Sequence, residues 1–403
     1  MAPEVAVSER DQVAEIVQAV RAVAGGLPVG GQRPLHEPEF SGNEWAYVKD
    51  CIDTGWVSSA GKYVDRFEEE LARYTGAKHA VAVVNGTAAL HVSLLLVGVQ
   101  PGDEVLLPTL TFIATANAVA YAGATWHFVD SEETTLGVDP ERLEAHLSSN
   151  AEMRDGVCYN RHTGARITAL VIMHAFGHPA RISELVELAA RWNLALVEDA
   201  AESLGSSVGE LHTGNFGRLA ALSFNGNKIV TTGGGGAILT NDSALARRAK
   251  HLTTTARVPH RWNFIHDEVG FNYRLPNINA ALGCAQLERI DDMLRRKRVL
   301  AERYSKALSH LEGVRFLSEP QGTRSNFWLC TLLLDDANPV LHEAIIEALN
   351  DAGLMARPVW TLMHRLPMFA DAPRADLSRA ENFTSRVINL PSSPNLAGPP
   401  RAA

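Results

Sequence analysis

The segment SFNGNKIVTTGGGGAILT, residues 223–240, places one lysine, Lys228, between a short apolar run and four consecutive glycines. The run AALSF (220–224) leads into this segment and the run GAILT (236–240) ends it, and short apolar runs of this kind are typical of buried strands. A lysine among small and polar neighbours is usually a surface cation. The rest of the chain favours a different role for Lys228.

Short apolar runs recur along the chain and alternate with amphipathic segments of helical length. A mostly parallel sheet that is covered by helices on both faces requires this pattern. We therefore expect an α/β fold. The seven runs are HAVAVV (79–84), EVLLP (104–108), ATWHFVD (124–130), ITALVIMH (167–174), LALVED (194–199), AALSF (220–224) and GAILT (236–240).

The chain has 403 residues, of which 46% are hydrophobic, and this length predicts two domains. Residues 10–24 predict a helix that ends at a pair of glycines. From about residue 285 the pattern predicts helices and strands of a smaller α+β domain. We expect an N-terminal helical extension at 1–34, a large domain at 35–284 and a small C-terminal domain at 285–403.

Composition excludes several classes of function. The net charge is -9 and no basic stripe is interleaved with aromatic residues, which argues against a nucleic-acid partner. No run reaches the roughly 20 apolar residues of a membrane span, and the first thirty residues carry charge throughout, unlike a signal peptide. The four cysteines are far apart and lack metal-binding spacing, so we expect a cytoplasmic protein without a metal site.

Ligands of such sheets bind beyond the carboxyl ends of the strands, so the residues that follow each run are the candidates. Gly86 and Thr87 lie between the run 79–84 and a predicted helix. A glycine lets backbone amides approach an anion, and a helix N-terminus offers free N–H groups, so this junction suits a phosphate. Taken alone, these residues are more often a simple strand-to-helix turn capped by Asn or Thr.

Asp199 ends the run 194–199, and Glu202 follows three residues later. Burying a carboxylate at a strand end is costly unless it meets a cation or a strong donor, and a pyridinium N–H is such a partner. If the following turn is helical, Glu202 projects into the same pocket. The alternative is that Asp199 only caps the next turn.

The segment around Lys228 completes a set that suits one cofactor. Ser223 and Asn225 can donate to a phosphate, and a desolvated lysine yields the neutral amine that condenses with aldehydes. The P-loop spacing GxxxxGK[ST] is absent, which excludes that ATP-binding motif. Pyridoxal phosphate needs a Schiff-base lysine, an anion for its ring nitrogen and a phosphate cup. Phe112 could supply an aromatic face for the ring, unless it is a core residue.

Seven motifs in consistent order resemble the nucleotide-sugar aminotransferases of the DegT/DnrJ/EryC1/StrS family, which have the fold-type I architecture of aspartate aminotransferase. The resemblance extends from about Leu35 to Ser393. It rests on GWVSSAGKYVDRFEEELA, VNGTAALH, PGDEVLLPTLTFIATANAV, HAFGHPA, VEDAAESLGS, SFNGNKIVTTGGGG and GFNYRLPNINAALGCAQLE.

The resemblance implies roles for the candidate residues. Lys228 would form the Schiff base with the cofactor and shuttle a proton, and Asp199 would keep the pyridine nitrogen protonated. Asn272 of GFNYRL would reach the cofactor phosphate from the other subunit of a homodimer, so the active site would be shared. The remaining implied contacts are Glu202 beside the ring hydroxyl, Phe112 stacked on the ring, and Gly86, Thr87 and Ser223 around the phosphate.

The expected substrate follows from the residue sequences of SFNGNKIVTTGGGG, LTTTARVPH and RPVWTLMHRLPMF and from the insertion-like segment NAEMRDGVCYNRHTGARIT. These segments are most similar to the subgroup that aminates UDP-linked 4-keto-6-deoxy-N-acetylhexosamines on routes to bacillosamine and legionaminic acid. The implied reaction takes the amino group from L-glutamate, with pyridoxamine phosphate as the intermediate form of the cofactor.

Three alternatives accompany this expectation. GDP-perosamine synthases share much of the same pattern. The family also contains a pyridoxal phosphate-dependent sugar dehydratase in which histidine replaces the lysine, and Lys228 argues against that activity. A homologue that keeps the fold without catalysis is the third alternative.

Overall fold

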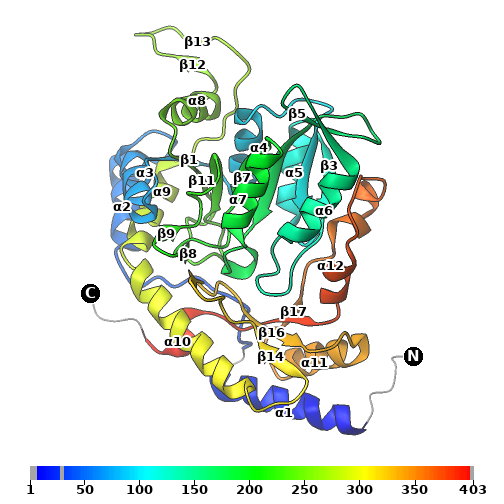
Figure 1. Cartoon of the computed structure of the whole chain (residues 1–403). Helices are drawn as coiled ribbons and strands as arrows, with labels where there is room; N and C mark the ends of the chain where they lie inside the picture. The colour runs from blue at the N-terminus through cyan, green and yellow to red at the C-terminus, as the bar shows by residue number, and fades with distance from the viewer. Residues whose placement is uncertain (1–6, 28–30, 400–403) are drawn as a thin grey trace.

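The computed structural model describes residues 7–27 and 31–399, so parts of the predicted segment 1–34 lie outside the described residues. At its centre is a seven-stranded sheet of order β1-β11-β10-β7-β6-β2-β3 (Figure 1). Each predicted run forms one of its strands, which confirms the expected α/β fold. The strands are β1 (His79–Val83), β2 (Glu104–Pro108), β3 (Thr125–Val129), β6 (Ile167–Met173), β7 (Ala195–Asp199), β10 (Leu219–Ser223) and β11 (Gly236–Thr240).

The sheet is mixed but mostly parallel. Strands β10, β7, β6, β2 and β3 pair in parallel, whereas β11 pairs antiparallel with both β1 and β10. Helices cover both faces, which explains why the strands are apolar without alternation. One face packs on α4 (Gly86–Leu96), α5 (Ile113–Tyr121) and α8 (Ser243–Thr253), and the other on α3 (Lys62–Thr75), α6 (Pro140–Asn150), α7 (Ile182–Arg191) and α9 (Asn277–Leu287).

Two glycines allow β10, β11 and the start of α4 to approach closely. A Cβ atom on Gly236 would lie 2.4 Å from the carbonyl carbon of Asn85, and one on Gly86 would lie 3.0 Å from the Cβ atom of Ser223. A backbone contact of 2.4 Å excludes a larger side chain at Gly236, whereas at Gly86 the Ser223 side chain would have to shift to admit one. Gly236 therefore serves the packing of the sheet itself.

A second, four-stranded antiparallel sheet of order β14-β16-β18-β17 lies in the C-terminal region. It packs with α10 (Ile290–Leu308) and α11 (Pro339–Asp351), which confirms the predicted α+β content. The predicted domain boundary after residue 284 falls within α9 and stays a prediction. The strands are β14 (Val314–Phe316), β16 (Cys330–Leu334), β17 (Arg357–Pro358) and β18 (Val387–Leu390).

The predicted N-terminal helix is α1 (Val7–Ala24), and it packs against α10 and α11. Ile16 and Val20 are fully buried in one cluster with Leu300 and Tyr304 of α10. The extension is therefore part of the hydrophobic core of the C-terminal region, although it precedes the part of the chain that carries the family motifs.

The remaining elements are short. A hairpin of β12 and β13 projects from the body of the molecule beyond α8 (Figure 1). None of the helices in the described part of the chain is long and apolar enough to cross a membrane. All four cysteines are free and buried. The short elements are α2 (Glu44–Thr54), α12 (Ser378–Phe383), β4 (Ala151–Arg154), β5 (Val157–Asn160), β8 (Ser207–Val208), β9 (Leu211–His212), β12 (Arg257–Val258), β13 (Ile265–His266) and β15 (Thr323–Arg324), with 3-10 turns at Ala175–Gly177, Met363–Arg365, Pro367–Phe369 and Pro394–Ala397.

Candidate active site

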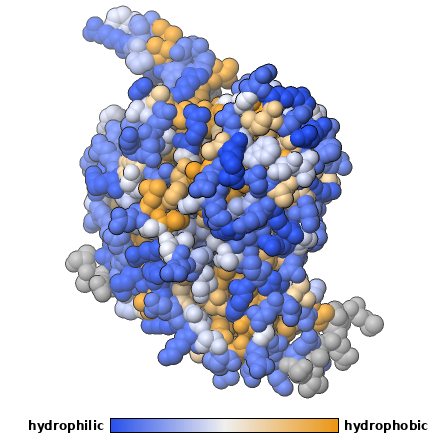
Figure 2. All heavy atoms as spheres, viewed as in Figure 1, coloured by the Kyte–Doolittle hydropathy of each residue, from blue (hydrophilic) through white to orange (hydrophobic). Residues whose placement is uncertain are grey.

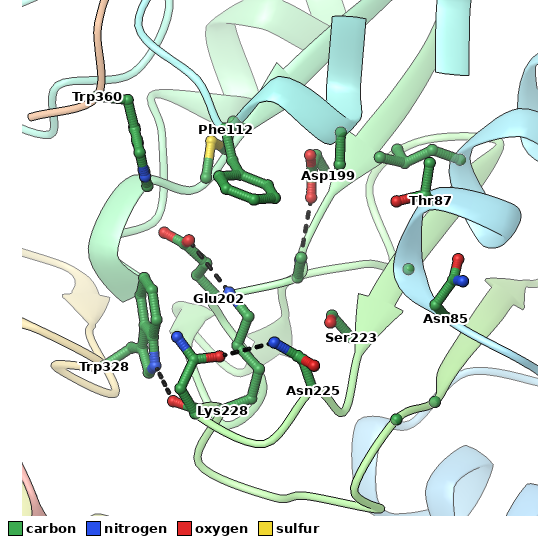
Figure 3. Close-up of a pocket in the computed structure, with 18 residues that line it drawn as sticks. Asn85, Thr87, Phe112, Asp199, Glu202, Ser223, Asn225, Lys228, Trp328 and Trp360 are labelled. Atoms are coloured by element: carbon green, nitrogen blue, oxygen red, sulfur yellow. Dashed lines mark hydrogen bonds and ion pairs between the residues drawn. The ribbon is translucent and has the colours of Figure 1, made fainter. Parts of the chain in front are cut away.

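A cavity of about 310 Å³ opens at the carboxyl ends of the sheet strands (Figure 3). Its walls come from the β1–α4 junction, the ends of β7 and β10, and the loop that carries the lysine. Eight of the nine predicted site residues line this one cavity, although they lie far apart in the sequence. They are Gly86, Thr87, Phe112, Asp199, Glu202, Ser223, Asn225 and Lys228.

The start of α4 forms the anion-binding end of the cavity. Asn85 caps the helix, since its side chain accepts a hydrogen bond of 2.8 Å from the amide of Ala88. The first N–H groups of a helix have no acceptor within the helix and attract anions. Capping and phosphate binding are therefore compatible here, because the cap uses the Ala88 amide while Gly86 and Thr87 line the cavity.

Asp199 is the last residue of β7 and is only 3% exposed. Thr115 donates a hydrogen bond of 2.6 Å to its Oδ2 atom, and the amide of Ala201 donates one of 3.2 Å to Oδ1. Burial raises the pKa of Asp199, against the opposing effects of these donors and of the Lys228 charge. The bond from Ala201 fits the alternative in which Asp199 caps the next turn, and this cap is compatible with a second role toward a cofactor. A cationic ring N–H beside this carboxylate would offset its desolvation.

Lys228 is a pocket residue and not a surface cation, because its side chain is only 13% exposed. Its Nζ atom lies 3.2 Å from the Oε1 atom of Glu202, whose Oε2 atom accepts a hydrogen bond of 2.9 Å from the amide of Phe176. Burial raises the pKa of Glu202 to about 7, although the Lys228 charge and the Phe176 amide act in the opposite direction. Glu202 reaches the pocket although the turn before it is not helical.

Aromatic side chains close the side of the cavity opposite the phosphate end (Figure 3). Phe112 precedes α5 and is 50% exposed, so it is not a core residue. Trp328 and Trp360 also line the cavity, and sequence reasoning did not identify either of them. Trp328 lies in the predicted α+β region and Trp360 in the segment RPVWTLMHRLPMF, and nothing in the local pattern separates them from core tryptophans.

Asn272 does not line the cavity of its own chain. Its backbone pairs with that of Thr254, and its Oδ1 atom accepts hydrogen bonds of 3.3 and 3.2 Å from the guanidinium of Arg274. A role for Asn272 in the cofactor site of a second subunit stays a prediction.

The donor set of the cavity fits pyridoxal phosphate. Lys228 supplies the amine, and the N-terminus of α4 suits the phosphate. Asp199 is a buried carboxylate whose hydrogen-bond donors among the described residues, Thr115 and the amide of Ala201, are both neutral. The geometry alone thus indicates an enzyme that acts on amines or carbonyl compounds through this cofactor.

Comparison with known proteins supports this assignment. Residues 38–400 match the model of the DegT/DnrJ/EryC1/StrS aminotransferase family. GDP-perosamine synthase of Escherichia coli O157:H7 is 37% identical over 364 residues, which cover 90% of this chain and 94% of the relative. EpsN of Bacillus subtilis (strain 168), which carries the name of a pyridoxal phosphate-dependent aminotransferase, is 39% identical over 366 residues, covering 90% of this chain and 91% of EpsN.

Among solved structures, DesV of S. venezuelae in complex with a ketimine intermediate is 31% identical, with a TM-score of 0.77 and coverage of 88% of this chain and 90% of DesV. The fold is therefore the fold-type I aminotransferase fold. The chain belongs to the DegT/DnrJ/EryC1/StrS aminotransferase family and is a pyridoxal phosphate-dependent nucleotide-sugar aminotransferase.

Proposed function

We propose that the enzyme transfers the amino group of L-glutamate to C4 of a UDP-linked 4-keto-6-deoxy-N-acetylhexosamine. The product would be a UDP-4-amino-4,6-dideoxy sugar for surface glycan or nonulosonic acid synthesis, of the bacillosamine or legionaminic acid type. The observation that carries the transamination itself is the cavity that holds Lys228, Asp199 and the N-terminus of α4 together. The segments noted in the sequence analysis support the choice of sugar.

Two cavity residues, Asp199 and Lys228, have definite tasks in this reaction. Pyridoxal phosphate, when bound, supplies an aldehyde that condenses with amines and a ring that accepts the electron pair of the α-carbon. Asp199 would hold the proton on the ring nitrogen, because a carboxylate beside that nitrogen stabilises its protonated, cationic form. Lys228 would take the proton from the α-carbon of glutamate and deliver it to the cofactor carbon that takes up the amino group, acting first as a base and then as an acid.

A GDP-linked 4-keto-6-deoxyhexose is the alternative sugar substrate, and the similarity to GDP-perosamine synthase favours it. Purified enzyme supplied with glutamate should be assayed against UDP- and GDP-linked 4-keto-6-deoxy sugars in parallel. Turnover of the UDP-linked N-acetyl sugar at the higher kcat/KM supports the proposal. Preference for the GDP sugar would replace it with the perosamine-type reaction.

We further propose that the enzyme is a cytoplasmic homodimer whose active sites are shared through Asn272. The hairpin before Asn272 exposes large apolar side chains, which single subunits rarely leave uncovered (Figure 2). Trp262, Phe264 and Val269 are 68%, 76% and 85% exposed. A second copy of the chain would cover them, and closed twofold symmetry is the commonest arrangement for such contacts.

A further inference from the structure

The amine of Lys228 lies on the face of an aromatic ring as well as beside a carboxylate. Its Nζ atom is 3.9 Å from the centre of the Trp328 ring (Figure 3). An ammonium over the face of tryptophan is attracted by the ring quadrupole, most strongly where both groups are shielded from water. This condition holds here, since Trp328 is 5% exposed and the Lys228 side chain 13%.

The Trp328 ring is held in this position by contacts that do not involve Lys228. Its indole N–H donates a hydrogen bond of 2.9 Å to the carbonyl of Asn227, the residue before Lys228. Its backbone amide donates to Oδ1 of Asn326 at 2.7 Å, and its carbonyl accepts from the buried Nζ atom of Lys297 at 3.1 Å. The ring is thus fixed in advance and tied to the loop that carries the lysine.

We propose that Trp328 is a positioning residue of the transamination, whose indole face holds the ammonium of Lys228 whenever that lysine is not bonded to the cofactor. This inference rests on the proposed function, in which Lys228 accepts a proton from the α-carbon of glutamate and then gives it to the cofactor carbon that takes up the amino group. The lysine is therefore a free amine that alternates between neutral and charged forms. The indole face stabilises the charged form at a defined place.

Glu202 alone does not stabilise the ammonium of Lys228 at all pH values. Because burial raises the pKa of Glu202 to about 7, its charge changes within the working range of most enzymes. The indole face does not titrate, so its attraction for the ammonium is independent of pH. Trp328 and Glu202 thus contact the same atom by two interactions of different kinds.

The test uses Trp328→Phe, which keeps an aromatic face but loses the N–H bond to Asn227, and Trp328→Leu, which loses both. Trp192→Leu is the matched control, since Trp192 follows α7 and its indole N–H donates to Glu144 outside the cavity. Each protein is converted to the pyridoxamine phosphate form, in which Lys228 is free. Acetylation of Lys228 by acetic anhydride is then measured by peptide mass spectrometry across a pH series.

Only a neutral amine is acetylated, so the pH midpoint of labelling reports how strongly the site holds the ammonium. We expect Trp328→Leu to shift the midpoint about one unit lower, Trp328→Phe to lie between it and the wild type, and the control to match the wild type. A midpoint that is unchanged or higher in Trp328→Leu, or equal in the Leu and Phe variants, overturns the proposal. Using the midpoint removes differences in access of the reagent, which scale the rate at every pH.

A second measurement distinguishes failure of the role proposed for Trp328 from failure of the proposed transamination. In the half-reaction with glutamate deuterated at the α-carbon, Trp328→Leu should show a larger isotope effect and a roughly ten-fold slower rate, because proton transfer becomes more rate-limiting. If Trp328→Leu behaves as the wild type while Lys228→Ala is inactive, Trp328 has no such role and the proposed function stands. If Lys228→Ala is itself active, the proposed function fails.

Discussion

Lys228 and Glu202 form a buried ion pair in which the carboxylate is fixed at both oxygens, one by the lysine at 3.2 Å and the other by the amide of Phe176 at 2.9 Å. Despite these contacts, burial raises the pKa of Glu202 to about 7. The pair is therefore fully ionised only above neutral pH. The charge beside the amine, and the stability of the folded protein, should both depend on pH through this one carboxylate.

The first prediction concerns stability. Between the unfolded pKa of about 4.5 and the folded pKa of about 7, the folded state binds more protons at Glu202, so stability falls as the pH rises through this window. The free energy of unfolding that is lost across this window through Glu202 approaches about 3 kcal/mol. Glu202→Gln should remove this slope. Urea unfolding of cofactor-free protein at pH 5 and pH 8 measures the change in the free energy of unfolding between the two pH values. An equal change in the wild type and in Glu202→Gln would contradict the prediction.

The second prediction concerns Lys228. Lys228→Ala should abolish transamination, because neither the Schiff base nor the proton transfer survives, and added small amines should partly restore proton transfer. Lys228→Arg is the matched control, since it keeps the charge beside Glu202 but cannot condense with the aldehyde. The wild type should be yellow and bleach with borohydride. Near-normal turnover by Lys228→Ala would eliminate the assignment of this lysine.

The third prediction concerns Asp199. Asp199→Asn leaves a neutral partner that no longer favours a protonated ring nitrogen, so the glutamate half-reaction should slow by roughly 10²-fold or more. Stopped-flow absorbance of the cofactor measures this rate. Titration with pyridoxal phosphate, as a control, shows whether the variant still binds the cofactor. An unchanged rate would mean that Asp199 only orders the turn through Thr115 and Ala201.

The sequence predicts the strands and the strand-end residues of this protein well, because apolar runs and the residues after them are local patterns. It predicts Gly86, Asp199 and Lys228 at one cavity because parallel strands end at one edge of a sheet. Trp328 and Trp360 could not be predicted in this way. They enter the cavity from the C-terminal region by tertiary packing, which leaves no periodic signal in the chain.

The roles of the neighbouring acids Glu198 and Asp199 also depend on the three-dimensional structure and not on residue type alone. They adjoin in β7, yet only Asp199 lines the cavity, since successive strand residues point to opposite faces. Glu198 instead accepts hydrogen bonds from the amides of Gly214, Phe216 and Gly217, at 2.6 to 2.7 Å. Residue type alone does not reveal which of the two acids is structural.

The fourth prediction follows from this contrast. Burial tends to raise the pKa of Glu198, but the His174 ring and the backbone amides outweigh it, and the net pKa is lowered. Its carboxylate therefore stabilises the fold above its unfolded pKa, and this stability is lost as the pH falls. Glu198→Gln should cost about 2–5 kcal/mol at pH 8, since an amide N–H would face buried donors. Urea unfolding measures the loss, and a cost under about 1 kcal/mol would contradict it.

The last prediction concerns assembly. Within one chain Asn272 contacts Arg274 and Thr254 and lies outside the cavity, so any contact with the cofactor phosphate must come from a second subunit. Asn272→Asp should place a repelling carboxylate beside that phosphate and inactivate the homodimer. Lys228→Ala inactivates it independently. When the two inactive proteins exchange subunits, a mixed dimer contains one site with both defects and one with neither.

Activity should therefore reappear on mixing, at up to about a quarter of the wild-type level per site, since half the dimers are mixed and each has one intact site. Differently tagged chains, purified over two columns, verify that exchange occurred. Mixing Lys228→Ala with Asp199→Asn is the matched control, because both residues line the cavity of the same chain and every mixed site keeps a defect. If exchange is verified and no more activity returns than in the control mixture, Asn272 does not act in the site of the other subunit. The assignment of Lys228 is unaffected by that outcome.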